Sequence, residues 1–206
     1  MKSLFFPIAI FVTAFISSIQ CLDLESAKEQ PCFKIKKTVP LITDDWVQPE
    51  PKAIYYPLMS RLDLYRNAID LLQKDPAEIS ESELYYDACI VWKCNNETYF
   101  SEGFGGRTRE YTADPEDDKM EVYTMRPLKG KGYGGKAFTT YSDNETFFFT
   151  AVCGDDGQMA WNVASLTPTL PRESVKIIHE HALSLGFKKE FFTELRYDRC
   201  HFQNDI

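Results

Sequence analysis

The amino-acid sequence predicts an all-β domain, either an up-and-down antiparallel barrel or a sandwich, followed by one C-terminal helix. Eight short segments with strand character follow one another, and turn-forming residues separate them at short, fairly regular intervals. This spacing is typical of barrels and sandwiches rather than of βαβ units. One amphipathic helical segment follows the last predicted strand.

The predicted strands are rich in aromatic and β-branched residues, and turn chemistry such as Gly105-Gly106 or Asp114-Pro115 bounds them. Pro57 interrupts the first strand, which predicts an edge or a bulge at that point. The eight predicted strands are residues 53–61, 85–94, 98–104, 107–112, 120–126, 137–141, 146–153 and 158–164.

Two segments outside the strands have helical periodicity. Apolar side chains recur at helical spacing in residues 62–74. The second helix is predicted to have Pro171 in its first turn and to stop at Gly186, with one apolar stripe between them. Residues 22–52 are predicted to be extended, because prolines interrupt them, and residues 80–83 are predicted to form a polar loop.

The first 21 residues predict secretion. Lys2 supplies a positive start, residues 4–16 are almost wholly apolar, and a small-residue zone leads to Cys21, as in a cleaved signal peptide. The apolar run is shorter than the roughly 20 residues that cross a bilayer, so we expect no membrane span. Residues 22–206 should then form a single secreted, extracellular domain.

The charge balance argues against two classes of partner. The chain has 31 Asp and Glu residues against 23 Lys and Arg residues, a formal net charge of −8. We expect such an acidic chain, which has no basic stripe, to repel nucleic acid and anionic membranes.

The number of cysteines predicts disulfides and one remaining thiol. In an oxidising compartment the cysteines of the mature chain should pair, and an odd number leaves one over. Sequons at Asn96 and Asn144 predict glycosylated turns. The five mature cysteines are Cys32, Cys89, Cys94, Cys153 and Cys200.

The order of eight strands, one helix and a cysteine-bearing tail resembles the lipocalins. Ser142-Asp143 and the strand that ends at Cys153 are similar to the family's Thr-Asp-Tyr turn and the strand after it. Residues 161–171, WNVASLTPTLP, resemble the last barrel strand and the entry to the family helix. The tail ending at Cys200 is similar to that of apolipoprotein D and the insect bilin-binding proteins, and the region around Cys89 resembles the second strand.

The first strand departs from the family pattern. Lipocalins carry Gly-x-Trp-Tyr there, whereas this chain has Ala53-Ile54-Tyr55-Tyr56, and Leu166 replaces the Arg that covers the family's Trp. The absence of the Trp and the absence of the Arg are consistent with each other, because the Arg would form a cation–π pair with the ring of that Trp. Trp46 followed by Tyr55-Tyr56 also resembles tick salivary lipocalins, which lack the long C-terminal helix.

The resemblance implies an eight-stranded up-and-down barrel with the C-terminal helix packed on it, and the disulfides Cys32–Cys153 and Cys89–Cys200. Cys94 is then left over, and strict alternation places it on the opposite face of the strand from Cys89. It is a buried inert thiol, a thioether link to a pigment, or a bridge between two copies of the chain.

The resemblance also suggests which side chains face inward. If Cys153 lies outside the barrel, as its family counterpart does, then Phe148, Thr150 and Val152 point into it. Aromatic rings and methionines suit a flat apolar ligand, although they can also simply fill a small barrel. The predicted lining is Tyr55, Met59, Trp92, Tyr123, Met125, Phe138, Phe148, Thr150 and Asn162.

The function implied is that of a secreted, non-enzymatic carrier of a small hydrophobic molecule: a tetrapyrrole, carotenoid, retinoid, sterol or fatty acid. It requires no cofactor beyond a bound pigment or lipid, and we expect a monomer or a weak homo-oligomer. The alternative is a salivary-type effector that sequesters a biogenic amine or lipid mediator, or binds a host protein. Glu121 beside Tyr123 is the one weak indication of an amine site. An isomerase or de-epoxidase built on the barrel is a third hypothesis.

Two further motifs are interpreted as structural. Residues 130–137 nearly fit the phosphate-binding loop, but Ala137 replaces the required Ser or Thr and no helix follows, so we predict a flexible loop. His179 and His181 are two residues apart on the predicted helix and do not share a face, so we expect no metal site.

Overall fold

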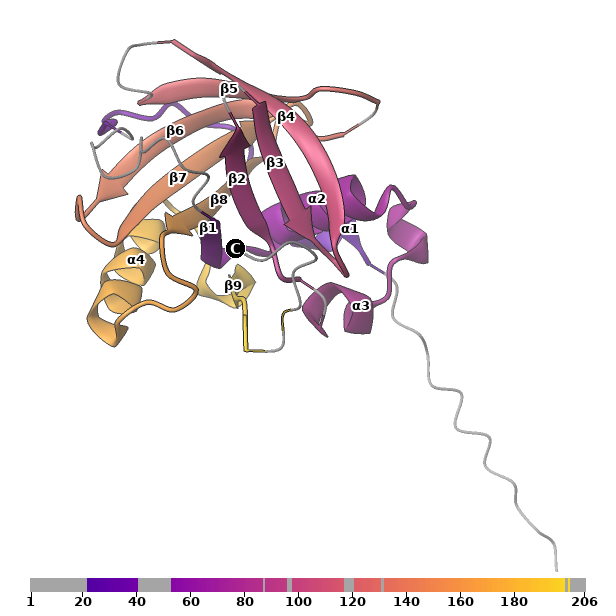
Figure 1. Cartoon of the computed structure of the whole chain (residues 1–206). Helices are drawn as coiled ribbons and strands as arrows, with labels where there is room; N and C mark the ends of the chain where they lie inside the picture. Colours follow the sequence, from indigo (N-terminus) through magenta and orange to yellow (C-terminus); the bar gives the residue numbers. More distant parts are fainter. Residues whose placement is uncertain are drawn as a thin grey trace, which may run out of the picture.

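The computed structural model describes residues 22–40, 53–86, 88–95, 98–116, 121–130, 132–198 and 200. Its main feature is one antiparallel sheet in the order β2-β3-β4-β5-β6-β7-β8-β1-β9, and an additional pairing of β2 with β1 closes the first eight strands into a barrel (Figure 1). The predicted fold class is confirmed. The signal peptide, Trp46 and Asn96 lie outside the described residues.

Consecutive strands of the barrel are neighbours, as in an up-and-down topology. The strands are β1 (Ile54–Ser60), β2 (Val91–Asn95), β3 (Thr98–Gly103), β4 (Arg107–Pro115), β5 (Val122–Pro127), β6 (Gly135–Ser142), β7 (Phe147–Gly154), β8 (Met159–Ser165) and β9 (Phe192–Glu194). The helices are α1 (Leu24–Ala27), α2 (Arg61–Leu72), α3 (Glu81–Tyr86) and α4 (Arg172–Ser184), with 3-10 turns at Pro76–Glu78 and Lys189–Phe191.

Several local predictions are wrong, and capping explains two of them. The turn predicted at Asp114-Pro115 is absent, because β4 continues through both residues, which pair with β5. The supposedly extended N-terminal region contains the one-turn helix α1, because the carboxylate of Asp23 accepts the backbone N–H of Glu25 at 3.1 Å. The predicted polar loop is the start of α3, where the Ser80 hydroxyl accepts the Glu83 N–H at 3.2 Å. Because α3 occupies its first residues, the second strand begins at Val91 rather than at residue 85.

A bulge at Pro57 decides which side chains of β1 face inward. The register of β1 against β8 shifts between Tyr55 and Leu58, as the missing N–H of a proline within a strand favours. Tyr56 points into the barrel, whereas the ring of Tyr55 lies 5.2 Å from that of Tyr197 in the C-terminal tail. The prediction that Tyr55 lines the interior is therefore wrong.

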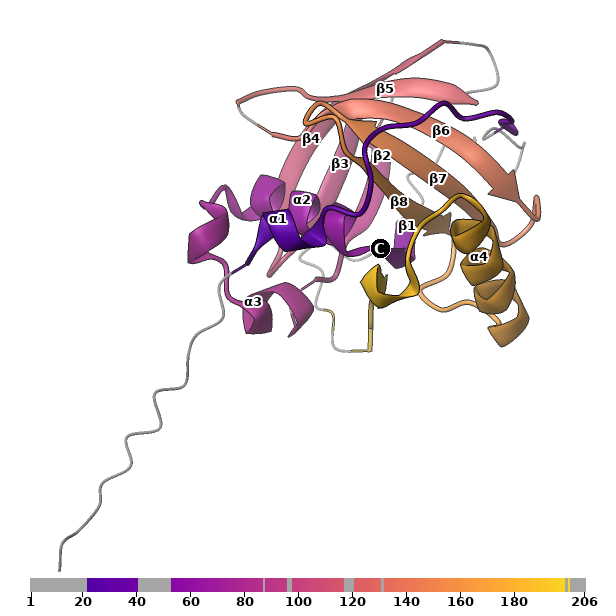
Figure 2. The same cartoon turned by 180° about the vertical axis from the view of Figure 1, so that it is seen from behind.

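Helix α4 packs on the outside of the barrel, against β7 and β8 (Figure 2), which confirms its predicted place. Ile178 and Ala182 are fully buried there, and the stacked rings of Phe149 and Trp161 lie 5.1 Å apart beneath them. These side chains form the first of two hydrophobic cores.

Helices α1, α2 and α3 gather at one end of the barrel (Figures 1 and 2). Helix α2 follows β1 directly and crosses this end, where it packs against β1, β3, β4 and β8. Its apolar side chains, such as Leu64 and Ala68, join Ala27, Ile79 and Leu84 in a second buried core. The apolar stripe predicted for residues 62–74 therefore packs between this small helical layer and the end of the barrel.

The two disulfides implied by the lipocalin resemblance are both present. Cys32–Cys153 joins the N-terminal segment to the end of β7, and Cys89–Cys200 joins the C-terminal tail to the segment before β2. Cys94 lies in β2, and its side chain is outside the described residues. Within the described ranges, no helix is long and apolar enough to cross a membrane.

Candidate functional site

The candidate site lies under the polar face of α2, which points into the barrel. Asp63, Arg66, Asn67 and Asp70 occupy positions i, i+3, i+4 and i+7, which places them on one face of the helix. They border a cavity of about 80 Å³. Its lining consists of Tyr56, Asp63, Arg66, Asn67, Asp70, Trp92, Tyr111, Met125, Tyr133, Gly134, Gly135, Val152 and Asn162.

Asp63 is a buried carboxylate whose partners among the described residues are side-chain amides, and its backbone N–H donates to the Ser60 hydroxyl. The side-chain amides of Asn162 and Asn67 donate to its Oδ2 at 3.1 Å and 3.4 Å. Among the described residues, no ion pair involves it. Burial raises the pKa of Asp63 to about 6, against the lowering by the Asn162 hydrogen bond and the charge of Arg66.

Asp70, two turns further along α2, is held by two donors. The Tyr111 hydroxyl donates to Oδ2 at 2.8 Å, and the Tyr133 backbone N–H donates at 2.9 Å. Burial raises the pKa of Asp70 to about 6, although these hydrogen bonds and the charges of Arg109 and Arg66 oppose the shift. Burial and the neighbouring carboxylate also raise the pKa of Tyr111, so that its hydroxyl remains a neutral donor.

The glycine-rich segment before β6 brings its backbone close to α2. A Cβ atom at Gly132 would lie 3.1 Å from Asp70 Oδ1 and 2.9 Å from an Arg109 guanidinium nitrogen. A Cβ atom at Gly134 would lie 2.6 Å from Asp155 Oδ2. Glycine is therefore required for this close approach. The segment predicted to be a flexible loop is a connection whose backbone donates to an α2 carboxylate.

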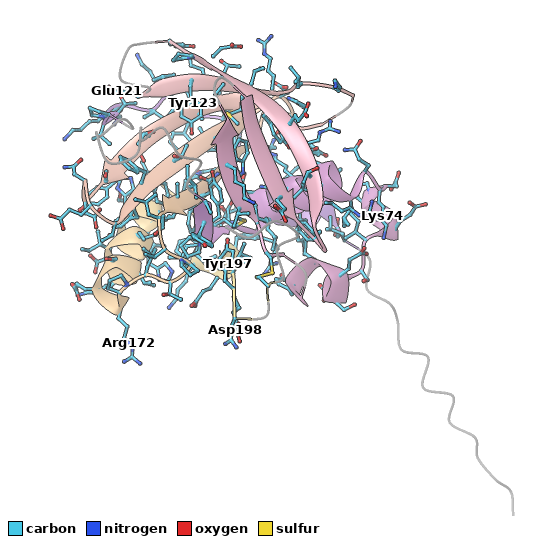
Figure 3. All side chains as sticks on the ribbon, viewed as in Figure 1. Lys74, Glu121, Tyr123, Arg172, Tyr197 and Asp198 are labelled. Atoms are coloured by element: carbon cyan, nitrogen blue, oxygen red, sulfur yellow. A yellow bond between two sulfur atoms is a disulfide. The ribbon has the colours of Figure 1, made fainter. Side chains whose placement is uncertain are left out.

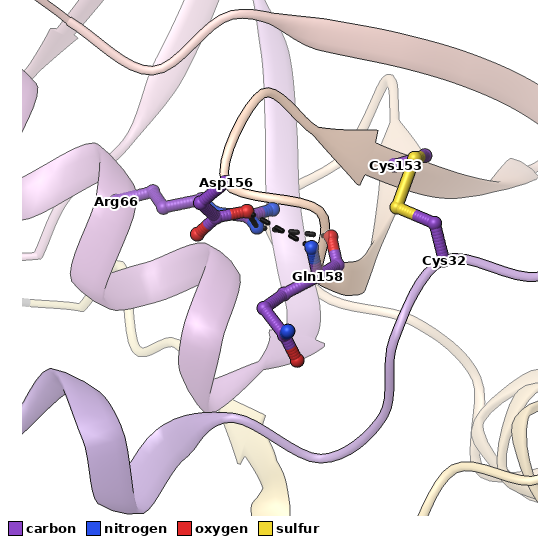
Figure 4. Close-up of a disulfide and its surroundings, with 5 residues drawn as sticks. All are labelled: Cys32, Arg66, Cys153, Asp156 and Gln158. Carbon is purple, nitrogen blue, oxygen red and sulfur yellow. Dashed lines mark hydrogen bonds and ion pairs between the residues drawn. A yellow bond between two sulfur atoms is a disulfide. The ribbon is translucent and has the colours of Figure 1, made fainter.

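Arg66 joins α2 to the turn between β7 and β8 (Figure 4). Its Nη2 donates to Asp156 Oδ1 at 2.5 Å and to the Gln158 carbonyl at 3.0 Å. The arginine side chain is 5% exposed. Its guanidinium carbon lies 5.8 Å from the centre of the Tyr133 ring. The buried positive charge is thus neutralised by the turn.

Aromatic rings form part of the cavity wall. The rings of Trp92 and Tyr111 lie 5.0 Å apart, and those of Tyr56 and Trp92 lie 6.3 Å apart. Met125 adds a flexible apolar side chain to the same lining. Such faces can stack on a flat ligand or receive a cation above a ring.

Three of the nine side chains predicted to line the interior border this cavity: Trp92, Met125 and Asn162. Four others occupy inward-facing strand positions but do not border this cavity; three of them are buried and Tyr123 is half-buried. They are Met59, Tyr123, Phe148 and Thr150. The inward direction of Phe148 and Thr150 agrees with Cys153, which packs with the outer core beneath α4.

The prediction for Phe138 is wrong, as is that for Tyr55. Phe138 pairs with Ala151, which belongs to the core beneath α4, and the Lys136 ammonium lies 5.7 Å from the Phe138 ring. Successive side chains of a strand alternate, so Ala137 faces inward and Phe138 outward.

Sequence reasoning missed the polar face of α2, although its spacing was visible in the residues 62–74. It offered Glu121 as the carboxylate of an amine site. Glu121 does not border the cavity; its Oε2 accepts from the Thr38 hydroxyl at 2.6 Å. Figure 3 shows it with Tyr123 beside β5, apart from Lys74 at the end of α2. Within the described ranges, no group of three or more His, Cys, Asp or Glu side chains could hold a metal ion.

Comparisons with known proteins give matches among solved structures. No family model and no curated protein matches the chain. Apocrustacyanin C2 is 8% identical, with a TM-score of 0.46 over 70% of this chain and 75% of that one. Lobster apocrustacyanin A1 is 8% identical, with a TM-score of 0.45 over 70% and 75%. H1 crustacyanin from the lobster Homarus americanus is 10% identical, with a TM-score of 0.46 over 81% and 92%.

The class of fold is lipocalin-like: a closed, eight-stranded, up-and-down antiparallel barrel with a C-terminal helix packed on its outside. The strand order, the pairing of β1 with β2, and the position of α4 define it.

Proposed function

We propose that this protein binds a compact small molecule beneath α2, and that the ligand carries an ammonium group beside an aromatic or aliphatic body. The observation that carries the proposal is Asp63. It is a carboxylate 6% exposed, at the edge of a cavity, with amide donors and no ion pair among the described residues.

The physical reason is charge compensation. Burying an ionised carboxylate is costly unless a cation or several donors compensate it. The cavity-facing side of α2 contributes Asp63 and Asp70, while the arginine between them, Arg66, is paired with Asp156. The charge of Arg109 acts on Asp70, which leaves Asp63 with the greater need of a cation. A ligand ammonium would supply the missing positive charge, and Trp92 and Tyr111 would supply ring faces for the rest of the molecule.

The volume of the cavity restricts the ligand. The cavity volume of about 80 Å³ is smaller than that of an apolar cavity that holds benzene, which is about 150 Å³. Even an amine with one ring therefore requires the surrounding side chains to move. A longer molecule requires α2 itself to move. The site therefore favours a compact amine over an extended ligand.

A second candidate is a small, largely apolar molecule without a charge. The aromatic wall and Met125 favour it, since apolar lining with a few placed polar groups is typical of ligand pockets. A tetrapyrrole, carotenoid, retinoid, sterol or fatty acid would have to displace α2 from the barrel end. Secretion, glycosylation at Asn144 and a monomeric or weakly associated state belong to this proposal too.

Isothermal titration with histamine and serotonin at pH 7.5, and with retinol and decanoate as apolar probes, tests the two candidates. We expect the amines to bind and their affinity to fall as the pH drops through about 6, because protonation removes the charge of Asp63. The variant Asp63→Asn should weaken amine binding about tenfold or more, since hydrogen bonds to charged groups contribute roughly 1.5–3 kcal/mol.

The matched control is Glu116→Gln, which removes an exposed carboxylate that pairs with Lys136. It should leave amine binding unchanged. Apolar probes that bind while amines do not would favour the second candidate, and the absence of binding by either class would reject both. Mass spectrometry of protein from a native source identifies any ligand that co-purifies and locates the mature N-terminus.

A further inference from the structure

The pairing of Arg66 is unusual for its position on α2. Arg66 follows Asp63 by three residues and precedes Asp70 by four, spacings at which oppositely charged side chains on a helix are neighbours. Its ion pair is instead with Asp156, in the turn between β7 and β8. Neither helix carboxylate has an ion pair among the described residues. The charge of Arg66 reaches both from its place in the turn, and that of Arg109 also reaches Asp70.

The β7–β8 turn is shaped to hold this guanidinium. Asp156 and the Gln158 carbonyl both accept from Arg66 Nη2, at 2.5 Å and 3.0 Å. A Cβ atom at Gly154 would lie 2.5 Å from the same nitrogen, so the guanidinium occupies the space that the missing side chain leaves. The turn itself is fixed by the Gly157 N–H, which donates to the Gly154 carbonyl at 2.9 Å.

We propose that Asp156 is a specificity-determining positioning residue: it holds Arg66 in the β7–β8 turn and so keeps that cation from neutralising Asp63 and Asp70. The inference rests on the proposed binding of an amine. Arg66 is attached to the same helix as the two carboxylates, so its effective concentration near them is high. Without Asp156 it would compete with the ligand for the negative charge.

If Asp156 holds Arg66 away from the two carboxylates, one result is expected that would not follow if Asp156 only stabilised the turn. The variant Asp156→Asn keeps the shape of the side chain and an oxygen for the Gln158 N–H, which donates to Asp156 Oδ1 at 3.1 Å. Arg66 should then turn toward Asp63 and Asp70, and affinity for an amine should fall at least tenfold. The double variant Arg66→Gln/Asp156→Asn should recover the affinity, because the internal competitor is gone.

The experiment is a double-mutant cycle on the full mature chain, read by titration with histamine and serotonin at pH 7.5. The variants are Arg66→Gln, Asp156→Asn and the pair, with Glu116→Gln as an unrelated charge control. Recovery in the double variant supports the inference. An equal loss in Asp156→Asn with and without Arg66 would show that Asp156 only supports the turn, and would overturn it while leaving amine binding intact.

A readout without ligand separates this inference from the proposed function. Carbon-detected NMR titration of the aspartate carboxyls should show lower pKa values for Asp63 and Asp70 in Asp156→Asn, and a return upward in the double variant. Gly154→Ala, which pushes the guanidinium out of its space, should lower them too if Asp156→Asn does not fold. Unchanged titration curves would overturn the inference, whereas failure of wild-type protein to bind either amine would reject the proposed function.

Discussion

At the scale of single residues, the site is marked by two buried carboxylates whose pKa values are raised. Asp63 and Asp70 are 6% and 3% exposed, and burial raises the pKa of each to about 6. A folded-state pKa above the unfolded value means that the native protein binds protons more tightly than the unfolded chain. Each group therefore favours folding below about pH 4, and this contribution is lost as the pH rises through about 6.

We predict from this sign that Asp63→Asn raises the free energy of unfolding at pH 7.5, by on the order of 2–3 kcal/mol, and changes it little at pH 4. Urea unfolding at several pH values measures the difference between variant and wild type. Comparison with wild type is needed because His179 and His181 have the opposite effect on stability as the pH changes. Burial lowers the pKa values of these two side chains, so their protonation destabilises the fold as the pH falls. A variant that is less stable at pH 7.5 would contradict the prediction.

The direction of single side chains was only partly predictable from the sequence. Alternation from Cys153 correctly turned Phe148 and Thr150 inward, because β7 keeps a regular register against β8. Alternation gave the wrong direction for Tyr55, because the bulge at Pro57 shifts the register of β1 against β8. The sequence indicates a bulge there but not the size of the shift. Positions in strands thus follow from alternation only as far as the pairing is regular.

At the scale of elements, α2 presents a polar face to the inside of the barrel. Its apolar side chains share a core with α1, α3 and residues of the barrel end such as Met59 and Phe104, and its polar face borders the cavity. The periodicity of residues 62–74 correctly predicted a helix. It could not predict which face meets the barrel, because the short helices that cover the apolar side lie in segments whose local patterns, rich in proline or charge, do not indicate helix.

We predict that Leu64→Ala, which truncates a fully buried side chain of this helical layer, lowers the free energy of unfolding by about 2–5 kcal/mol. Leu183→Ala is the matched control, since Leu183 on α4 is 48% exposed and should cost under about 0.5 kcal/mol. Urea unfolding gives both values, and hydrogen exchange of α2 should accelerate in the first variant only. Equal effects of the two substitutions would show that the layer over the barrel end does not hold α2.

At the scale of the whole molecule, the hydrogen-bonded ring of strands and the two disulfides have separate tasks. The ring closes through the β1–β2 pairing, and this closure involves no cysteine. The disulfides attach the segments at either end of the chain, across sequence separations of 121 and 111 residues. The pairing was predictable only through the lipocalin resemblance, because five cysteines allow many combinations and their spacing does not choose among them.

We therefore predict that replacing either pair with serine leaves a folded barrel of reduced stability. A chain of this length can bury a sufficient core without disulfides. The chain-entropy model gives a loss of roughly 4–5 kcal/mol for each long loop, before any change in the native state. Urea unfolding of Cys32→Ser/Cys153→Ser and Cys89→Ser/Cys200→Ser measures the loss in the free energy of unfolding. Similar losses in the two double variants would agree with that model.

The two pairs join different segments, so their losses should add in the fourfold variant to within about 0.5 kcal/mol if they act independently. Near-ultraviolet circular dichroism reports whether Trp161, buried beneath α4, keeps its packing in each variant. Loss of that signal after removal of Cys32–Cys153 alone would mean that the N-terminal segment is part of the barrel's folding unit, and that the ring of strands is not sufficient by itself.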